Sequence, residues 1–380
     1  MARLADPAAP HLLIDARPLT GARNGITRFV EQLVAAWPVS PAFQTTLISN
    51  RPVRSNASLP EGVECLQDEH PLARLPGTLW MTLRVPALAR RLGATHFLGT
   101  QHVLPLWRTG GLHQGVIVHD LVFELFPDTM TRSNRLLTGY FAPRSIRRAS
   151  HIFCVSNTTR TDLQRYFGAA ADGALVCYPG RTSMPMGPAS TMQASNGNGN
   201  GMLRLLVVGS MEPRKNIGRL LEAFLLAAEL APGLTLDLVS GDAWGHVLGE
   251  DIWVRLREHP RFHIHQRISD ESMLALYRHA DYLVFPSLYE GFGLPILETV
   301  GHCAVVANDI PIFREIAGLV DGMRLMDFQA DAATIAAQLA KLSDTGKPAP
   351  TDDRGAFSWE SSVERILAEM NLIPATQRLA

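Results

Sequence analysis

The chain has 380 residues, of which 46% are hydrophobic and 19% are charged, and its formal net charge is −1. This length exceeds one typical core and favours a globular protein of two domains. No run of about 18 apolar residues occurs, so no membrane-spanning helix is expected. Residues 1–10 lack the basic and apolar segments of a signal peptide, so no leader is expected.

The cysteines and the distribution of charge narrow the class further. The four cysteines are scattered without metal spacing, which is typical of reduced thiols in a cytosolic protein. They are Cys65, Cys154, Cys177 and Cys303. Residues 1–185 contain 19 Arg and no Lys against 12 acidic residues, whereas the remainder has 16 basic and 24 acidic residues. A basic first half indicates either an anionic partner or charges that only balance the acidic half.

The first half of the chain begins as an α/β domain with a glycine-containing loop. Residues 11–15 are predicted to form a buried strand, and residues 18–30 a loop that opens onto a helix. Gly25 lies just ahead of that helix. A strand, a glycine loop and a helix start together create a site that suits an anion. Residues 45–49 are predicted to form a second strand, and residues 51–76 to be irregular.

Residues 79–92 mix apolar side chains with arginine and include Trp80, and Pro86 interrupts the segment. An amphipathic, Arg-bearing segment with a Trp suits an anionic membrane surface. An ordinary helix that packs on the core fits the same pattern. Both interpretations stay open at this point.

Polar side chains follow the next strands. Residues 95–99 and 115–120 are predicted strands, and the second ends in His119 and Asp120. This position is the carboxyl edge of the sheet, where open α/β sheets bind ligands. An Arg-rich helical stretch follows at residues 132–148. The first sheet is completed by a strand at 150–156, a helix that starts at 157–163, and a short strand at 174–180.

A Gly/Asn-rich stretch, residues 183–201, predicts a flexible linker in the middle of the chain. After it, apolar strands alternate with helical stretches, which predicts a second parallel, doubly wound sheet. The expected strands are residues 203–209, 234–240, 262–265, 281–285, 304–307 and 323–326.

The first turn of the second half carries two basic residues. Gly209 ends the strand, and Arg214 and Lys215 come just before a helix that starts near Asn216. A guanidinium and an ammonium beside a helix start form a clamp for a diphosphate. The alternative is a pair of solvated basic residues in a loop.

A glycine-rich turn follows the predicted strand at 281–285. Gly291 and Gly293 predict a tight turn, and Pro295 suits the first turn of a helix. The backbone N–H groups of such a turn suit a phosphate or a sugar hydroxyl. The carboxylates of Glu290 and Glu298 flank this turn.

Several of these motifs resemble one family. The stretch E-G-F-G-L-P-I-L-E, from Glu290 to Glu298, is similar to the E-x7-E signature of the retaining glycosyltransferases of family 4. G-S-M-E-P-R-K-N resembles the motif that grips the donor diphosphate in that family, and V-I-V-H-D-L resembles a segment near its donor sugar. The Gly25 loop resembles the family's G-I-G-R-Y, but Thr27 replaces the second Gly. The resemblance covers nearly the whole chain and is most specific over residues 203–360.

The resemblance implies the GT-B fold, an α/β architecture of two Rossmann-like, doubly wound parallel-sheet domains that face a cleft. F-S-W at residues 357–359 looks like the start of the family's helix that crosses back onto the first domain. We therefore expect an acceptor-binding domain at residues 1–185, completed by a helix at 358–380. A flexible linker at 186–201 and a nucleotide-sugar-binding domain at 202–357 complete the expected organisation.

The resemblance also assigns roles to individual residues. The catalytic set it implies is His119, Glu290, Arg214 and Lys215, with Asp120 as a candidate on the acceptor side. The donor-binding residues it implies are Gly25, Gly209, Arg214, Lys215, Gly291, Phe292, Gly293, Leu294 and Glu298. Glu298 would accept hydrogen bonds from the ribose, and Glu290 would hold hydroxyls of the sugar ring. His119 would join them when the cleft closes.

Two positive charges at the departing diphosphate supply the stabilisation that the reaction needs, so no metal and no other cofactor is expected. No nucleophile stands out, which favours front-face attack by the acceptor hydroxyl. The expected reaction is retaining transfer of a hexose, with mannose from GDP-mannose as the first choice.

The expected acceptor is a hydroxyl of a glycan or of a polyprenyl-diphosphate-linked oligosaccharide in cell-surface polysaccharide biosynthesis. The protein would then be cytoplasmic, with peripheral contact to an anionic membrane at the inner face of the plasma membrane. A sugar-nucleotide epimerase of the same fold and an inactive nucleotide-sugar-binding module are the alternatives. Nucleic acid is not an expected partner, because no element interleaves its arginines with stacking aromatics.

Overall fold

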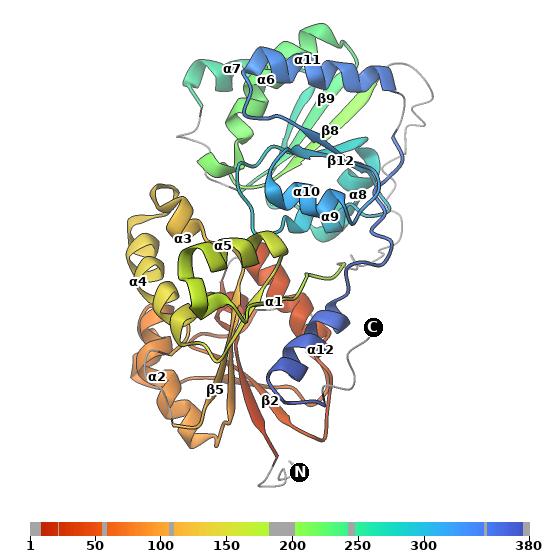
Figure 1. Cartoon of the computed structure of the whole chain (residues 1–380). Helices are drawn as coiled ribbons and strands as arrows, with labels where there is room; N and C mark the ends of the chain where they lie inside the picture. The colour runs from red at the N-terminus through yellow and green to blue at the C-terminus, as the bar shows by residue number, and fades with distance from the viewer. Residues whose placement is uncertain are drawn as a thin grey trace. The chain divides into compact units, whose positions relative to one another are not determined.

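The chain folds into two compact units (Figure 1). The computed structural model describes residues 9–21, 23–54, 59–105, 110–181, 202–241, 248–345 and 348–374. The first unit comprises Met1–Gly180 with Phe357–Ala380, and the second comprises Arg181–Ala356. The expected linker at 186–201 lies outside the described residues, as does the end of the expected C-terminal helix at 375–380.

The first unit is built on a parallel sheet with the strand order β3-β2-β1-β4-β5-β6-β7. The strands are β1 His11–Asp15, β2 Gln44–Ser49, β3 Glu64–Gln67, β4 His96–Gly99, β5 His113–Val118, β6 His151–Cys154 and β7 Leu175–Val176. The helices are α1 Gly25–Ala35, α2 Gly77–Arg91, α3 Val122–Leu125, α4 Arg132–Arg148, α5 Asn157–Phe167 and α12 Trp359–Glu369. The order reverses between β1 and β4, which creates a switch point at their carboxyl ends.

The second unit repeats this architecture with the strand order β10-β9-β8-β11-β12-β13. The strands are β8 Leu203–Val208, β9 Leu234–Val239, β10 Phe262–His265, β11 Tyr282–Phe285, β12 Ala304–Asn308 and β13 Met323–Met326. The helices are α6 Ile217–Leu230, α7 Glu250–Glu258, α8 Asp270–His279, α9 Leu294–Glu298, α10 Pro311–Ala317 and α11 Ala332–Leu342. Here the order reverses between β8 and β11, so their carboxyl ends form the switch point of this unit.

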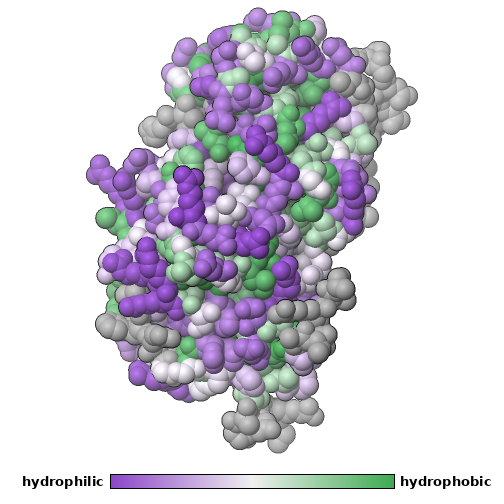
Figure 2. All heavy atoms as spheres, in the orientation of Figure 1, coloured by the Kyte–Doolittle hydropathy of each residue, from purple (hydrophilic) through white to green (hydrophobic). Residues whose placement is uncertain are grey.

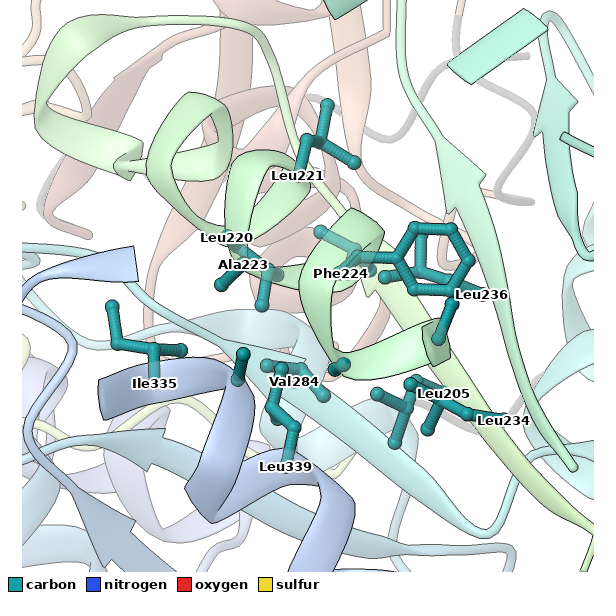
Figure 3. Packing of buried hydrophobic residues seen from close by; sticks show 14 of the residues in the cluster. Leu205, Leu220, Leu221, Ala223, Phe224, Leu234, Leu236, Val284, Ile335 and Leu339 are labelled. Atoms are coloured by element: carbon teal, nitrogen blue, oxygen red, sulfur yellow. The ribbon is translucent and has the colours of Figure 1, made fainter. Parts of the chain in front are cut away.

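Each sheet is buried because helices cover its faces. In the second unit, α6 and α11 pack together on one face of the sheet, with apolar side chains between them and the strands (Figure 3). This cluster includes Leu205, Leu220, Leu221, Ala223, Phe224, Leu234, Leu236, Val284, Ile335 and Leu339. The face of the molecule seen in Figure 2 is mostly hydrophilic, with hydrophobic residues in small patches.

The predicted strands are all present, with bounds that shift by a few residues. One strand was missed, because the stretch predicted to be irregular contains the short edge strand β3. Most of its residues are exposed, so it lacks the apolar signal of a buried strand. The expectation that Pro86 interrupts residues 79–92 is wrong, because α2 runs through it.

The helix α2 packs on the core, which decides against the membrane interpretation of Trp80. The Trp80 side chain is fully buried, and its Nε1 donates a hydrogen bond of 2.8 Å to Asp68 Oδ2. Arg84 pairs with the same carboxylate at 3.0 Å. Neither side chain therefore faces a membrane. Within the described parts of the chain, no helix combines the length and the hydropathy that are needed to span a bilayer.

The C-terminal helix α12 belongs to the first unit. Ser362 Oγ donates a hydrogen bond to the carbonyl oxygen of Tyr178, and the ring of Tyr178 packs edge to face on Phe357. A side chain at Gly180 would collide with the backbone nitrogen of Trp359. These contacts attach the start of α12 to the last strand region of the first sheet.

Candidate active site

The basic pair predicted from the sequence lies at the switch point of the second sheet. Arg214 and Lys215 follow β8 and end a short 3-10 helix, Pro213–Lys215. The neighbouring strand β11 leads into the loop that carries Glu290, and β8 and β11 are paired in parallel. The Leu288 N–H donates to the Arg214 carbonyl oxygen at 2.8 Å, which holds the two loops together.

Glu290 joins both cations in one cluster. Its Oε1 forms an ion pair with Lys215 Nζ and accepts a hydrogen bond of 2.8 Å from Ser287 Oγ. Its Oε2 lies 3.4 Å from a terminal nitrogen of Arg214. All three charged side chains are largely buried, so their positions are held more firmly than those of a surface ion pair. The interpretation of Arg214 and Lys215 as solvated loop residues is therefore wrong.

A second carboxylate orients Arg214 from the other side. Arg214 Nε donates to Glu212 Oε2 at 3.0 Å, and Ser210 Oγ donates to Glu212 Oε1 at 2.6 Å. Lys215 Nζ also lies 5.4 Å from the centroid of the Phe285 ring. The guanidinium and the ammonium are thus fixed before any ligand arrives, which is the preorganisation that an anion site needs.

The side-chain amides of Asn216 and Asn308 hold the loops that carry the cluster of Arg214, Lys215 and Glu290. Asn216 has a left-handed backbone, with φ of 55°, and its side-chain amide donates to the Phe328 carbonyl oxygen at 2.8 Å. Asn308 donates to the Ser287 carbonyl oxygen at 3.0 Å and accepts from the Phe328 N–H at 3.0 Å. Asn308 was not singled out from the sequence, because its partners lie 21 and 20 residues away.

The glycine turn after Glu290 is built as expected, although its helix is short. Gly293 has φ of 106°, and a side chain there would lie 3.2 Å from the rings of Phe285 and Phe313. Only glycine fits this position without strain. Pro295 lies in the first turn of α9, as predicted, but α9 has only five residues. Its dipole is therefore weaker than that of a longer helix. Gly291, Phe292 and Leu294 complete the turn.

Glu298 is buried at the end of α9, away from the bulk solvent. Its Oε2 accepts a hydrogen bond of 2.7 Å from the Tyr277 hydroxyl, which comes from α8. Tyr277 is itself fully buried. Tyr277 was not identified from the sequence, because its role depends on how α8 packs against α9. Gly209 directly follows β8, in the loop that leads to Arg214, and its N–H donates a hydrogen bond of 3.0 Å to the Val239 carbonyl oxygen.

His119 lies just past β5, in the first unit, and is held as a neutral imidazole. Its Nε2 lies 2.7 Å from the Thr100 carbonyl oxygen. A carbonyl only accepts hydrogen bonds, so Nε2 carries the proton and Nδ1 is the acceptor. Burial and the neighbouring His102 together lower the pKa of His119 to about 4, against the opposing effects of the bond to Thr100 and the charge of Asp120.

The remaining predicted residues of the first unit lie near the switch point of its sheet. The Asp120 carboxylate accepts a hydrogen bond of 3.1 Å from the Val122 N–H. Gly25 begins α1, whose cap is Asn24, and no atom would obstruct a side chain at Gly25. Thr27, which replaces the family's second glycine, turns inward and donates to the Pro18 carbonyl oxygen at 3.0 Å. The Thr27 side chain is therefore buried and does not project from the surface of the loop.

The second unit thus brings together Arg214, Lys215 and Glu290, with the glycine turn directly after Glu290. Glu298 lies one helical turn further along and bonds to Tyr277 instead. His119, Asp120 and Gly25 belong to the first unit. Among the described residues, no group of three or more His, Cys, Asp or Glu side chains is arranged to hold a metal ion.

Comparison with known proteins places these residues in context. Residues 203–345 match the family model described as glycosyl transferases group 1. The serotype-specific mannosyltransferase WbdA of Escherichia coli is 30% identical over 179 residues, which are 46% of this chain and 22% of that protein. The O-antigen chain mannosyltransferase B of Escherichia coli is 30% identical over 249 residues, 60% of this chain and 62% of that one. The chain therefore spans about a fifth to three fifths of the length of these relatives.

Solved structures share the fold. Sucrose-phosphate synthase from Thermosynechococcus elongatus superposes with a TM-score of 0.64 over 95% of each chain, at 17% sequence identity. Together with the two parallel sheets, this match confirms the predicted α/β class with two Rossmann-like units.

Proposed function

We propose that this chain is a glycosyltransferase, because residues 203–345 match the family model of glycosyl transferases group 1 and the fold is of the GT-B type. It moves a hexose from a nucleotide-diphosphate sugar to a hydroxyl group of an acceptor glycan. The donor binds to the second unit, at the carboxyl ends of β8 and β11.

The observation that carries this proposal is the shared ion pairing of Arg214 and Lys215 with Glu290. A nucleotide-sugar diphosphate brings two negative charges, and its departure adds charge to the leaving oxygen. Two cations already fixed at one point stabilise that charge without reorganisation. Glu290 keeps them in place while the site is empty and limits their mutual repulsion.

In the proposed reaction, the acceptor hydroxyl oxygen bonds to the anomeric carbon on the face from which the diphosphate departs. The bond between the anomeric carbon and the diphosphate oxygen breaks, and its electron pair stays on the diphosphate. The hydroxyl proton passes to that departing diphosphate. The configuration at the anomeric carbon is retained, and the positive charges of Arg214 and Lys215 do the work that a metal does in other transferases.

The other site residues take roles that follow from their contacts. Glu298 offers its carboxylate to the ribose hydroxyls, with its position set by Tyr277. His119 uses Nδ1 as a hydrogen-bond acceptor for a hydroxyl of the donor sugar, since Nε2 is engaged with Thr100. Neutral imidazole serves this role across the physiological pH range, because burial keeps the pKa of His119 at about 4.

For the donor we propose GDP-mannose, since the relatives quoted above are named as mannosyltransferases. For the acceptor we propose a glycan carried on polyprenyl diphosphate, as in the assembly of cell-surface polysaccharide. The arginine excess of residues 1–185 suits such an anionic acceptor. The cytoplasm, next to the inner face of the plasma membrane, is the corresponding location.

A transfer assay tests the proposal. Purified protein is incubated with GDP-mannose, UDP-glucose or ADP-glucose and a mannoside or lipid-linked oligosaccharide acceptor, with and without EDTA. We expect transfer from one donor, an EDTA-insensitive rate, and a product with the anomeric configuration of the donor by NMR. Glu290→Gln should lose activity at least a hundredfold, whereas Glu258→Gln, an exposed acid on α7, should not.

Three results would contradict the proposal. A product of inverted configuration would reject the retaining reaction. Conversion of the donor to an epimer without acceptor would make the protein an epimerase. Donor binding without transfer to any acceptor would make it a binding module.

A further inference from the structure

The helices α2 and α4 of the first unit form a layer with an unusual charge pattern. They pack against each other and run along one side of the sheet (Figure 1). Together they contain eight arginines and no acidic residue: Arg84, Arg90, Arg91, Arg132, Arg135, Arg144, Arg147 and Arg148. Their inner faces, which include Trp80 and Phe141, are buried in the core. Arg84 is largely buried against Asp68, and the other seven arginines are exposed.

The outer face of α4 carries apolar residues as well as arginine. Arg132, Leu136, Tyr140, Arg144 and Arg148 follow one another at intervals of four, so they form one line along the helix. The Leu136 side chain is 74% exposed and Tyr140 is 50% exposed. Exposing a leucine to water in this way is unfavourable, and burial of the side chain against a partner would recover that free energy.

The arginines of this face are arranged around the apolar centre. The Arg144 guanidinium lies 3.6 Å from the centroid of the Tyr140 ring and donates to the Tyr140 carbonyl oxygen at 2.7 Å. The guanidinium itself therefore covers one face of the ring in a cation–π contact, while half of the Tyr140 surface stays exposed. On α2, Leu83 is also half exposed, and Arg90 and Arg91 are exposed near the end of the helix.

We propose that the outer face of α4, extended by α2, docks on the surface of an anionic lipid bilayer. Leu136 and Tyr140 enter the boundary between headgroups and acyl chains, and the flanking arginines pair with lipid phosphates. Exposed apolar residues set among arginines combine the two attractions that hold a protein surface on anionic lipid. A nucleic acid fits less well, because Tyr140 is the single stacking side chain on this line.

This inference deepens the proposed function, because docking on the bilayer would bring the enzyme to a lipid-linked acceptor. It rests on the proposed function for the identity of that acceptor. The sequence left open either membrane contact or core packing for residues 79–92. The contacts of Trp80 and Arg84 with Asp68 exclude these two residues from that role, and the proposal places the membrane contact on α4 and on the exposed residues of α2.

Vesicle co-sedimentation tests the proposal with the full chain. The vesicles contain phosphatidylcholine alone or with about 30% phosphatidylglycerol. Wild type should bind only the anionic vesicles, and binding should weaken as salt screens the charges. The double variant Arg132→Glu, Arg144→Glu should bind roughly tenfold more weakly or worse. The double variant Leu136→Ser, Tyr140→Ser should also lose binding at salt levels where wild type still binds.

A matched control is available on α7. That helix also exposes an apolar residue beside arginine, since Val254 is 43% exposed and Arg255 is exposed, but it carries Glu250, Asp251 and Glu258 as well. The control variant Val254→Ser, Arg255→Glu should bind anionic vesicles as wild type does. Failure of wild type to bind them, or equal binding by the α4 variants, would overturn the proposal.

Transfer to a water-soluble acceptor separates this inference from the proposed function. The α4 variants should keep that transfer and lose only vesicle binding. If wild type binds vesicles but transfers no sugar, the proposed function fails and the docking surface stands. If wild type is retained by heparin or DNA but not by vesicles, the surface serves another polyanion and the lipid proposal is wrong.

Discussion

The ring of Phe29 meets the ring of His119 edge to face, with their centroids 4.6 Å apart. Phe29 comes from α1 and packs on Trp359 of α12 at 5.0 Å, while His102 approaches His119 from another direction at 5.4 Å. Three segments far apart in the sequence therefore hold one imidazole, whose Nε2 is already bonded to Thr100. The C-terminal helix thus helps to position the histidine that is expected to act on the donor sugar.

Replacing Phe29 with Leu should loosen His119 and admit water to it. We expect kcat to fall roughly tenfold to a hundredfold, because small displacements of a positioned group are costly, while KM for the donor changes little. The pKa of His119 should rise from about 4 towards the normal range as burial is relieved, so the acidic limit of activity moves to higher pH.

The control for this prediction is Phe43→Leu, at a buried phenylalanine of the same unit that takes no part in the contacts of His119. It should lower stability without moving the pH profile. An unchanged pH profile and kcat in Phe29→Leu would show that the ring contact does not position His119.

The positions of the buried strands along the chain and the glycine turn before α9 were predictable from the sequence, because each depends on local signals. Apolar runs mark the buried strands, and Gly293 with Pro295 marks the turn before α9. The short edge strand β3 was not predictable, since its exposed residues give no apolar pattern. The predicted interruption at Pro86 was wrong, because packing of α2 on the core outweighs the one backbone hydrogen bond that proline removes.

The contacts that position the site were harder to predict. Arg214, Lys215 and Glu290 were identified as functional from their motifs, but their shared ion pairing joins loops 75 residues apart. Tyr277 and Asn308 support that region through side chains on other elements, and no local pattern marks them. Ser287, three residues before Glu290, was within reach of a motif argument, since a hydroxyl at that spacing can face the carboxylate.

Removing the Tyr277 hydroxyl should destabilise the second unit and weaken nucleoside binding. Tyr277→Phe deprives the buried Glu298 carboxylate of a donor at 2.7 Å, which costs about 1–3 kcal/mol of unfolding free energy. Binding of a nucleoside diphosphate should weaken, whereas binding of inorganic diphosphate should not. Chemical denaturation and titration calorimetry measure the two effects.

Tyr282→Phe is the matched control for that variant. The Tyr282 hydroxyl is buried and has no hydrogen-bond partner within the described parts of the chain. Its removal should leave the free energy of unfolding unchanged or raise it. Equal effects of the two variants would contradict the role given to the bond between Tyr277 and Glu298.

A side chain at Gly293 should distort the turn that follows Glu290. Gly293→Ala combines an unfavourable φ of 106° with contacts of 3.2 Å to two phenylalanine rings. We expect a loss of about 1–3 kcal/mol of stability and weaker nucleotide binding. Gly301→Ala, at φ of 81° with no atom within 4 Å, strains only the backbone, so its loss of stability should be smaller. A Gly293→Ala protein as stable as Gly301→Ala would argue against crowding at the turn.

The stability of the first unit should fall in mild acid. His119 has a pKa of about 4 when folded and about 6.5 when unfolded, so the unfolded state binds more protons between these values. The unfolding free energy therefore decreases as pH falls from about 6.5 to 4, by about 3 kcal/mol for this group alone. His119→Gln, which can still donate to Thr100, should flatten the pH dependence of urea unfolding. An unchanged slope would mean that His119 titrates normally.

Titration calorimetry of GDP, UDP and ADP tests the central claim, that Arg214 and Lys215 form the donor diphosphate site. The protein is compared with Lys215→Ala and with Lys341→Ala, which removes an exposed lysine of α11. We predict that one nucleotide binds tightly, that Lys215→Ala weakens it at least tenfold, and that Lys341→Ala binds as wild type does. Failure of wild type to bind any of the three, or equal binding by Lys215→Ala and Lys341→Ala, would contradict this account.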